Sequence, residues 1–182
     1  QLKPDFRFAT MLAQKNQNYY ITFTGSPSFT QDNLAELLLS FTKHHIKTIK
    51  GNIVIDSSQY QAPNYPSGTS YDDLGWYYAA PDTAAILNEN MVSFDLISAT
   101  ELGQPVQVKP KTMLNALKII NEVTTVGKEE EKEHCSLNLE IKHQNTIRLF
   151  GCVVQNKNPK LIELAIPAPI LLIKQIVKNF LD

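Results

Sequence analysis

Residues 135–153 carry the sequence CSLNLEIKHQNTIRLFGCV, in which apolar and polar side chains alternate on both sides of a polar turn. Alternation with a period of two is typical of strands that bury one face. A three-residue turn at 142–144 sets the pairing and places Leu137 opposite Leu149. The sequence therefore predicts a β-hairpin, and the hairpin indicates that this part of the chain is rich in β-structure.

Both cysteines of the chain, Cys135 and Cys152, lie in this hairpin. The predicted pairing places Cys135 opposite Gly151, and a glycine inside a strand often marks a bulge. A bulge at Gly151 would turn Cys152 toward Cys135, so we expect a disulfide between the two. Closing a loop of about 18 residues is worth ~3 kcal/mol, and such a bond indicates an oxidising compartment. The alternative, on the residues alone, is a pair of buried free thiols.

The first sixty residues predict the order strand, strand, helix, strand. Short strands are expected within 6–12 and 19–24, and a β-branched strand at 52–56. Thr30 or Asp32 caps the helix between them. Its apolar residues recur at helical spacing, namely Leu34, Leu37, Leu38 and Phe41.

Residues 57–82 form a long loop of a different composition. It combines prolines and glycines with six aromatic residues, namely Tyr60, Tyr65, Tyr71, Trp76, Tyr77 and Tyr78. A loop of this length within a compact domain is usually functional or disordered, and aromatic rings need a surface to pack on. We therefore expect a functional site in this loop.

The rest of the chain predicts further strands and helices. Strands are expected at 91–97 and 161–166, a helix at about 112–123, and a C-terminal helix with Pro169 in its first turn. Together the elements predict an α+β fold, with a mostly antiparallel sheet and flanking helices. A smaller β-rich domain, residues 88–160, is expected to be inserted into a domain formed by 1–87 with 161–182.

Composition excludes several classes of protein. The 182 residues include 17 basic and 18 acidic ones, for a net charge of −1, whereas a nucleic-acid-binding protein carries a basic surplus. No apolar run approaches the length of a transmembrane helix. The histidines lack metal-ligand spacing, and no glycine-rich phosphate loop is present. We therefore predict no metal and no cofactor.

Three short segments imitate the motifs of penicillin-recognising serine enzymes, which need S-x-x-K, S-x-N and K-T-G. They are SFTK (40–43), SLN (136–138) and KTM (111–113). Ser40 is expected in the last turn of its helix, away from the positive helix end that favours a nucleophile. Ser136 is expected on the polar face of the hairpin, and Met113 replaces the required glycine. We therefore predict that none of the three segments is catalytic.

Four stretches, in order, resemble the DacB-type D-alanyl-D-alanine carboxypeptidase/endopeptidases, the class C penicillin-binding proteins. They are PDFRFAT (4–10), IKGNIVIDSS (49–58), DLGWYYAAP (73–81) and the cysteine hairpin that ends in FGC (150–152). Members of this family carry a large insert between S-x-x-K and S-x-N. The resemblance places this chain inside that insert, so its partner would be the catalytic domain of the same protein. It implies no catalytic residue here and a periplasmic location.

The same resemblance implies one contact with substrate. In the family, the acid and the aromatic residue of the D-x-x-x-x-(F/Y) loop bind the free amino end of a diaminopimelate side chain in the peptidoglycan stem peptide. The matching positions are Asp73 and Tyr78. A carboxylate pairs with an ammonium, and a ring packs on the methylenes that lead to it. On the residues alone, Asp73 could instead be a turn residue and Tyr78 a core residue.

Two other functions are compatible with the sequence. One is a free-standing periplasmic binding or scaffold module without a catalytic parent. The other is a complete small hydrolase that uses Ser40 and Lys43, which covalent labelling by a penicillin would reveal.

Overall fold

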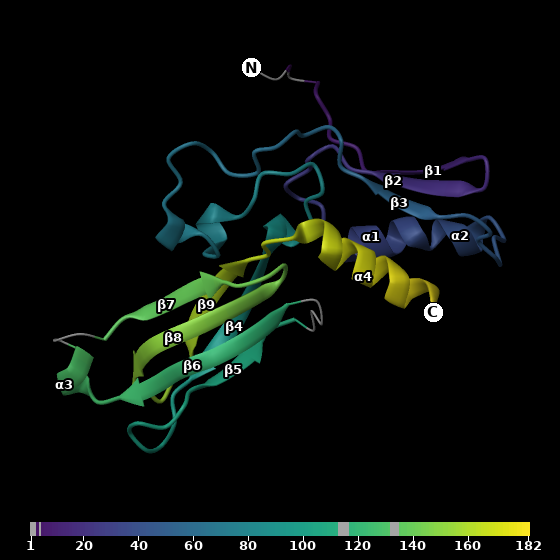
Figure 1. Cartoon of the computed structure of the whole chain (residues 1–182). Coiled ribbons are helices and arrows are strands. Elements are labelled where there is room, and N and C mark those ends of the chain that lie inside the picture. Colours follow the sequence, from purple (N-terminus) through teal and green to yellow (C-terminus); the bar gives the residue numbers. More distant parts are fainter. Residues whose placement is uncertain (1–2, 4, 113–116, 132–134) are drawn as a thin grey trace. The chain divides into compact units, whose positions relative to one another are not determined.

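The computed structural model describes residues 3, 5–112, 117–131 and 135–182 (Figure 1). The chain divides into two compact units, and each is interrupted by the other in sequence. The first consists of 1–66, 82–89 and 169–182, and the second of 67–81 and 90–168.

The first unit contains a three-stranded sheet in the order β1-β2-β3. Its strands are β1 (Met11–Lys15), β2 (Asn18–Thr22) and β3 (Ile53–Asp56). β1 and β2 form an antiparallel hairpin whose turn contains Asn16 at φ 58°, and β3 runs parallel to β2. The helices α1 (Gln31–Leu38) and α2 (Ser40–Lys43) connect β2 to β3. The predicted order of strands and helix is confirmed for the first sixty residues, with two differences. The first strand lies at 11–15 and not within 6–12, and the single predicted helix is divided into α1 and α2.

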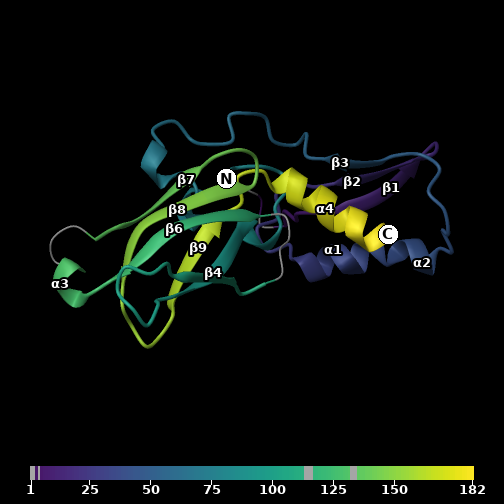
Figure 2. The ribbon, with the colours of Figure 1, turned by 60° about the horizontal axis from the view of Figure 1, so that its bottom comes forward.

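Thr30 caps α1 and so settles the choice between Thr30 and Asp32. Its side chain accepts a hydrogen bond from the backbone N–H of Asn33 at 3.2 Å, and the Asn33 side chain accepts from the Thr30 N–H at 2.9 Å. These reciprocal bonds satisfy two N–H groups that a helix start otherwise leaves free. Helix α4 (Pro169–Leu181) lies beside α1 (Figures 1 and 2) and buries Leu172 and Ile173.

The second unit is a sandwich of two three-stranded sheets (Figures 1 and 2). One sheet has the order β5-β4-β9, built from β4 (Met91–Ile97), β5 (Gln107–Pro110) and β9 (Lys160–Ala165). The other has the order β6-β8-β7, built from β6 (Lys118–Val126), β7 (Leu137–Ile141) and β8 (Thr146–Val154). The short helix α3 (Lys128–Glu131) follows β6. Inward side chains of both sheets form the core, including Phe94, Leu96, Val123, Ile147, Leu149 and Leu164.

The α+β class with mostly antiparallel pairing is confirmed, because four of the six strand pairings among the described residues are antiparallel. Two segments differ from the predicted division of the chain. The strand β9 pairs with β4 and therefore lies in the second unit. Residues 67–81 also belong to the second unit, because Trp76 bridges to Leu164 on β9. Among the described residues, no helix is long and apolar enough to span a bilayer.

The predicted helix at 112–123 is wrong. Residues 118–126 form the strand β6, which runs parallel to β8 over nine residue pairs, and 113–116 lie outside the described residues. The sequence KIINEVTTV is rich in β-branched residues, which favour strands. Val123 and Thr125 are buried while Glu122 and Thr124 are exposed, so the burial has the period of a strand.

The hairpin β7–β8 is confirmed, but its predicted register is wrong by two residues. Leu139, not Leu137, lies opposite Leu149, and the turn spans 142–145. The fourth turn residue is Asn145, whose side chain makes two hydrogen bonds with the backbone of Ala168, at 2.8 and 3.0 Å. These bonds fix Asn145 in the turn, next to the start of β8.

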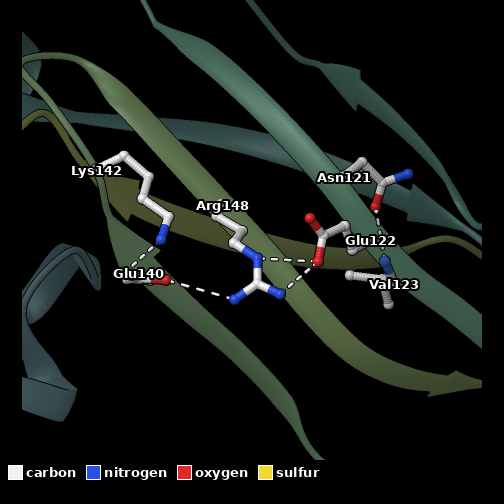
Figure 3. Close-up of polar contacts among 6 residues, drawn as sticks. All are labelled: Asn121, Glu122, Val123, Glu140, Lys142 and Arg148. Carbon is white, nitrogen blue, oxygen red and sulfur yellow. Dashed lines mark hydrogen bonds and ion pairs between the residues drawn. The ribbon is translucent and has the colours of Figure 1, made fainter.

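A chain of charges on the outer face of the sheet matches the observed register (Figure 3). Arg148 on β8 lies opposite Glu140 and donates to it at 3.4 Å, and its Nε donates to Glu122 on β6 at 2.9 Å. Lys142 donates to the second oxygen of Glu140 at 2.6 Å. The bonds from Arg148 and Lys142 lower the pKa of Glu122 and Glu140, respectively, below the ordinary value. Opposite charges across strands favour this pairing over a slipped one.

The disulfide between Cys135 and Cys152 is confirmed, with Cα atoms 5.4 Å apart. Gly151 precedes Cys152 and has φ 98°, in the region that favours glycine. A Cβ at this position would lie 2.0 Å from the carbonyl oxygen of Ser136. The same oxygen accepts a hydrogen bond from the Cys152 N–H at 3.1 Å. Glycine thus allows the close approach of the two backbones beside the disulfide.

Candidate functional site

Residues 67–81 fold into two short 3₁₀ turns in the second unit. The first, η1 (Tyr71–Asp73), is capped by Ser70, whose hydroxyl accepts from the Asp72 N–H at 3.3 Å. The second, η2 (Tyr77–Ala79), begins after Trp76. The Trp76 N–H donates to the Asp73 carbonyl at 3.1 Å and links the two turns. The backbone therefore brings residues 73 and 78 close together.

Gly75 fixes this loop to two strands of the same unit. Its carbonyl oxygen accepts from the Ala165 N–H at the end of β9 at 2.8 Å. Its φ is 96°, and a Cβ there would lie 2.4 Å from Cδ1 of Leu139 on β7. A glycine is needed both for the backbone conformation and for the close packing. The loop is thus held between the edges of the two sheets.

The two residues singled out by the sequence, Asp73 and Tyr78, are in direct contact. The Tyr78 hydroxyl donates to Oδ1 of Asp73 at 3.1 Å. The Tyr78 ring meets the Tyr77 ring edge to face, with centroids 5.4 Å apart. Tyr78 is 62% exposed, so it is not a core residue. The Asp73 side chain bonds to Tyr78, while its backbone N–H and C=O maintain the turns.

The Asp73 carboxylate has no cationic partner among the residues that the structure describes. No ion pair in the described part of the chain involves Asp72 or Asp73. Oδ1 of Asp73 accepts a hydrogen bond from the Tyr78 hydroxyl, and no residue in the described part of the chain donates to Oδ2. A half-buried carboxylate in contact with an exposed tyrosine is suited to bind a cation that carries an apolar stem.

The pKa of Tyr78 provides a test of this contact. Partial desolvation, the hydrogen bond to Asp73 and the charge of Asp73 raise the pKa of the Tyr78 phenol above its ordinary value. We expect Asp73→Asn to lower this pKa partway toward 10, the ordinary value, because the contribution of desolvation remains. An NMR titration of the Tyr78 ring carbons measures it. Asp72→Asn is the matched control and should leave the pKa of Tyr78 almost unchanged; an equal fall in both variants would contradict the contact.

The three segments that imitate serine-enzyme motifs show no catalytic arrangement in the described residues. Ser40 begins the separate four-residue helix α2 and does not lie in the last turn of a longer helix, because the first helix ends at Leu38. No hydrogen bond in the described residues joins Ser40 to Lys43. The Asn138 amide donates to the Ser136 hydroxyl at 2.9 Å, so the two residues of the second segment bond to each other.

In the third segment, Lys111 forms an ion pair with Asp95 at 3.2 Å on the surface of the second unit. Met113 lies outside the described residues. No group of three or more histidine, cysteine or acidic residues within the described ranges is arranged to hold a metal ion. The loop that carries Asp73 and Tyr78 therefore remains the candidate site.

This chain belongs to the D-Ala-D-Ala carboxypeptidase 3 (S13) family, whose model matches residues 1–182. The match confirms the predicted family. Among individual proteins, the chain is 25% identical over 166 residues to D-alanyl-D-alanine carboxypeptidase DacB of Haemophilus influenzae. This similarity covers 87% of the chain and 34% of that protein.

Two crystal structures of penicillin-binding protein 4 (dacB) from Haemophilus influenzae have the same fold. The first matches with a TM-score of 0.82 at 22% identity and covers 96% of this chain and 39% of that one. The second, a complex with a novel β-lactam, matches with a TM-score of 0.78 at 22% identity and covers 97% and 38%. The chain thus spans between a third and two fifths of the length of these relatives.

Proposed function

We propose that this chain is an accessory, non-catalytic region of a serine-type D-Ala-D-Ala carboxypeptidase/endopeptidase that acts on peptidoglycan stem peptides. Family membership over the whole chain supports the enzyme class. The proposal assigns the acylating serine, S-x-N and K-T-G to the catalytic domain of the same protein. The disulfide supports an oxidising location such as the periplasm.

We further propose that Asp73 and Tyr78 bind the amino end of a stem-peptide side chain. The observation that carries this proposal is the hydrogen bond between them, on an exposed loop held by Gly75. Asp73 supplies the charge for an ammonium, and the exposed Tyr78 ring supplies a surface for methylenes. The alternative is a binding or scaffold module without a catalytic parent, in which these residues have no substrate.

A fluorescent penicillin tests the non-catalytic role. We expect no covalent labelling of the purified chain, because acylation needs a serine with an activating lysine within hydrogen-bond reach. A penicillin-binding protein labelled in parallel provides the positive control. Labelling of the chain that disappears in Ser40→Ala but persists in Ser136→Ala would show that the chain is itself an acyl-enzyme, and would overturn the proposal.

A further inference from the structure

We propose that the Tyr78 hydroxyl determines specificity at this site by occupying one oxygen of Asp73, so that a primary ammonium is preferred to a guanidinium. The inference rests on the proposed function and extends it to the choice between cationic side chains. Tyr78 is then more than a ring for methylenes to pack on. It is a positioning residue that determines whether a ligand can bind both oxygens of the Asp73 carboxylate equally well.

The geometry separates the two oxygens of the Asp73 carboxylate. Oδ1 lies 3.1 Å from the Tyr78 hydroxyl. The hydroxyl can hold this position because the Tyr78 ring rests edge to face against the Tyr77 ring at 82°. The turns η1 and η2 fix the backbone at both ends of the contact, through the bond from the Trp76 N–H to the Asp73 carbonyl. One carboxylate oxygen is thus engaged within the protein before a ligand arrives.

An ammonium and a guanidinium place different demands on such a carboxylate. A guanidinium binds best through two parallel N–H···O bonds, one to each oxygen. An ammonium is a compact charge with three donors and needs only one oxygen. The Tyr78 hydroxyl therefore weakens the second hydrogen bond of a bound guanidinium, whereas it has little effect on the binding of an ammonium. One hydrogen bond of ordinary net strength corresponds to a preference of about threefold to tenfold.

The loop contains a matched control. Tyr71 lies in η1, is 73% exposed, and its hydroxyl makes no hydrogen bond in the described part of the chain. Tyr71→Phe removes a phenol hydroxyl from the same loop without touching Asp73. Tyr78→Phe removes the hydroxyl but keeps the ring and its contact with Tyr77.

The test uses the complete carboxypeptidase that contains this region under the proposed function. Two stem-type peptides ending in D-Ala-D-Ala are compared, one with lysine and one with arginine at the side-chain position, and kcat/KM is measured for each. We expect the wild type to prefer lysine. Tyr78→Phe should reduce the lysine-to-arginine ratio by about threefold to tenfold, through a better KM for the arginine peptide. Tyr71→Phe should leave the ratio unchanged.

The outcomes are separable. If the enzyme releases D-Ala from neither peptide, the proposed function fails and this inference fails with it. If both peptides are substrates but the ratio is the same in Tyr78→Phe and in wild type, the proposed function stands and the role of the hydroxyl is refuted. A ratio that changes equally in Tyr71→Phe would also refute it, because the effect would then come from the loop as a whole.

Discussion

Leu149→Ala should lower the free energy of unfolding of the second unit by about 2–5 kcal/mol. Leu149 lies in β8, the central strand of its sheet, and is fully buried. Truncation of its side chain removes apolar surface from the sandwich and leaves a cavity. The cavity is filled only partly, because β8 is held by hydrogen bonds on both edges and cannot move far. Urea denaturation followed by tryptophan fluorescence measures the change, because Trp76 is the single tryptophan and lies in this unit.

Leu161→Ala is the matched control for this experiment. Leu161 lies in β9 of the same unit but is 54% exposed, so the same deletion of side-chain atoms should cost much less, about 0.5–1 kcal/mol. A destabilisation by Leu149→Ala no larger than that by Leu161→Ala would contradict the burial of Leu149 between the two sheets.

Removal of the disulfide should lower the stability of the second unit by about 3 kcal/mol. The bond joins residues 17 apart in sequence, across the β7–β8 hairpin. Without it the unfolded chain gains the entropy of an open loop, while the hairpin loses its covalent tie beside Gly151. The double variant Cys135→Ser/Cys152→Ser, compared with wild type by urea denaturation, measures the difference.

A reducing agent provides the control for the disulfide experiment. The chain has only two cysteines, so a reductant should shift the unfolding midpoint of the wild type and have no effect on the double variant. Equal midpoints for the wild type in oxidising and reducing buffer would mean that the bond contributes nothing to stability. That result would also weaken the inference of an oxidising location.

The candidate site shows what a sequence motif can predict and what it cannot. The pattern D-x-x-x-x-(F/Y) selects Asp73 and Tyr78, but it contains no information on whether the two side chains touch. Their contact depends on two consecutive 3₁₀ turns and on Gly75 between them, whose φ of 96° lies in the region that favours glycine. The charge chain of Glu140, Arg148 and Glu122 was not predicted, because its members become neighbours only when β6, β8 and β7 lie side by side.

Local physics was sufficient for much of the fold. The strands at 91–97 and 161–166, the helix that starts at Pro169 and the pairing of two cysteines follow from residues within a few positions of each other or from a single hairpin. Hydrophobic periodicity, helix capping and turn preferences act between residues that are close in sequence, so they can be identified from the sequence alone.

Pairing between distant segments was decided by the tertiary structure alone. The strand β6 was expected to be a helix, and its partner in parallel pairing, β8, follows about twenty residues later in the chain, a separation for which the sequence carries no spacing signal. The turn residue Asn145 between β7 and β8 bonds to Ala168, and no local pattern links these two residues. Contacts between distant segments stabilise the fold only after the chain has closed the loops between them. They therefore decide between strand pairings that local sequence preferences do not distinguish.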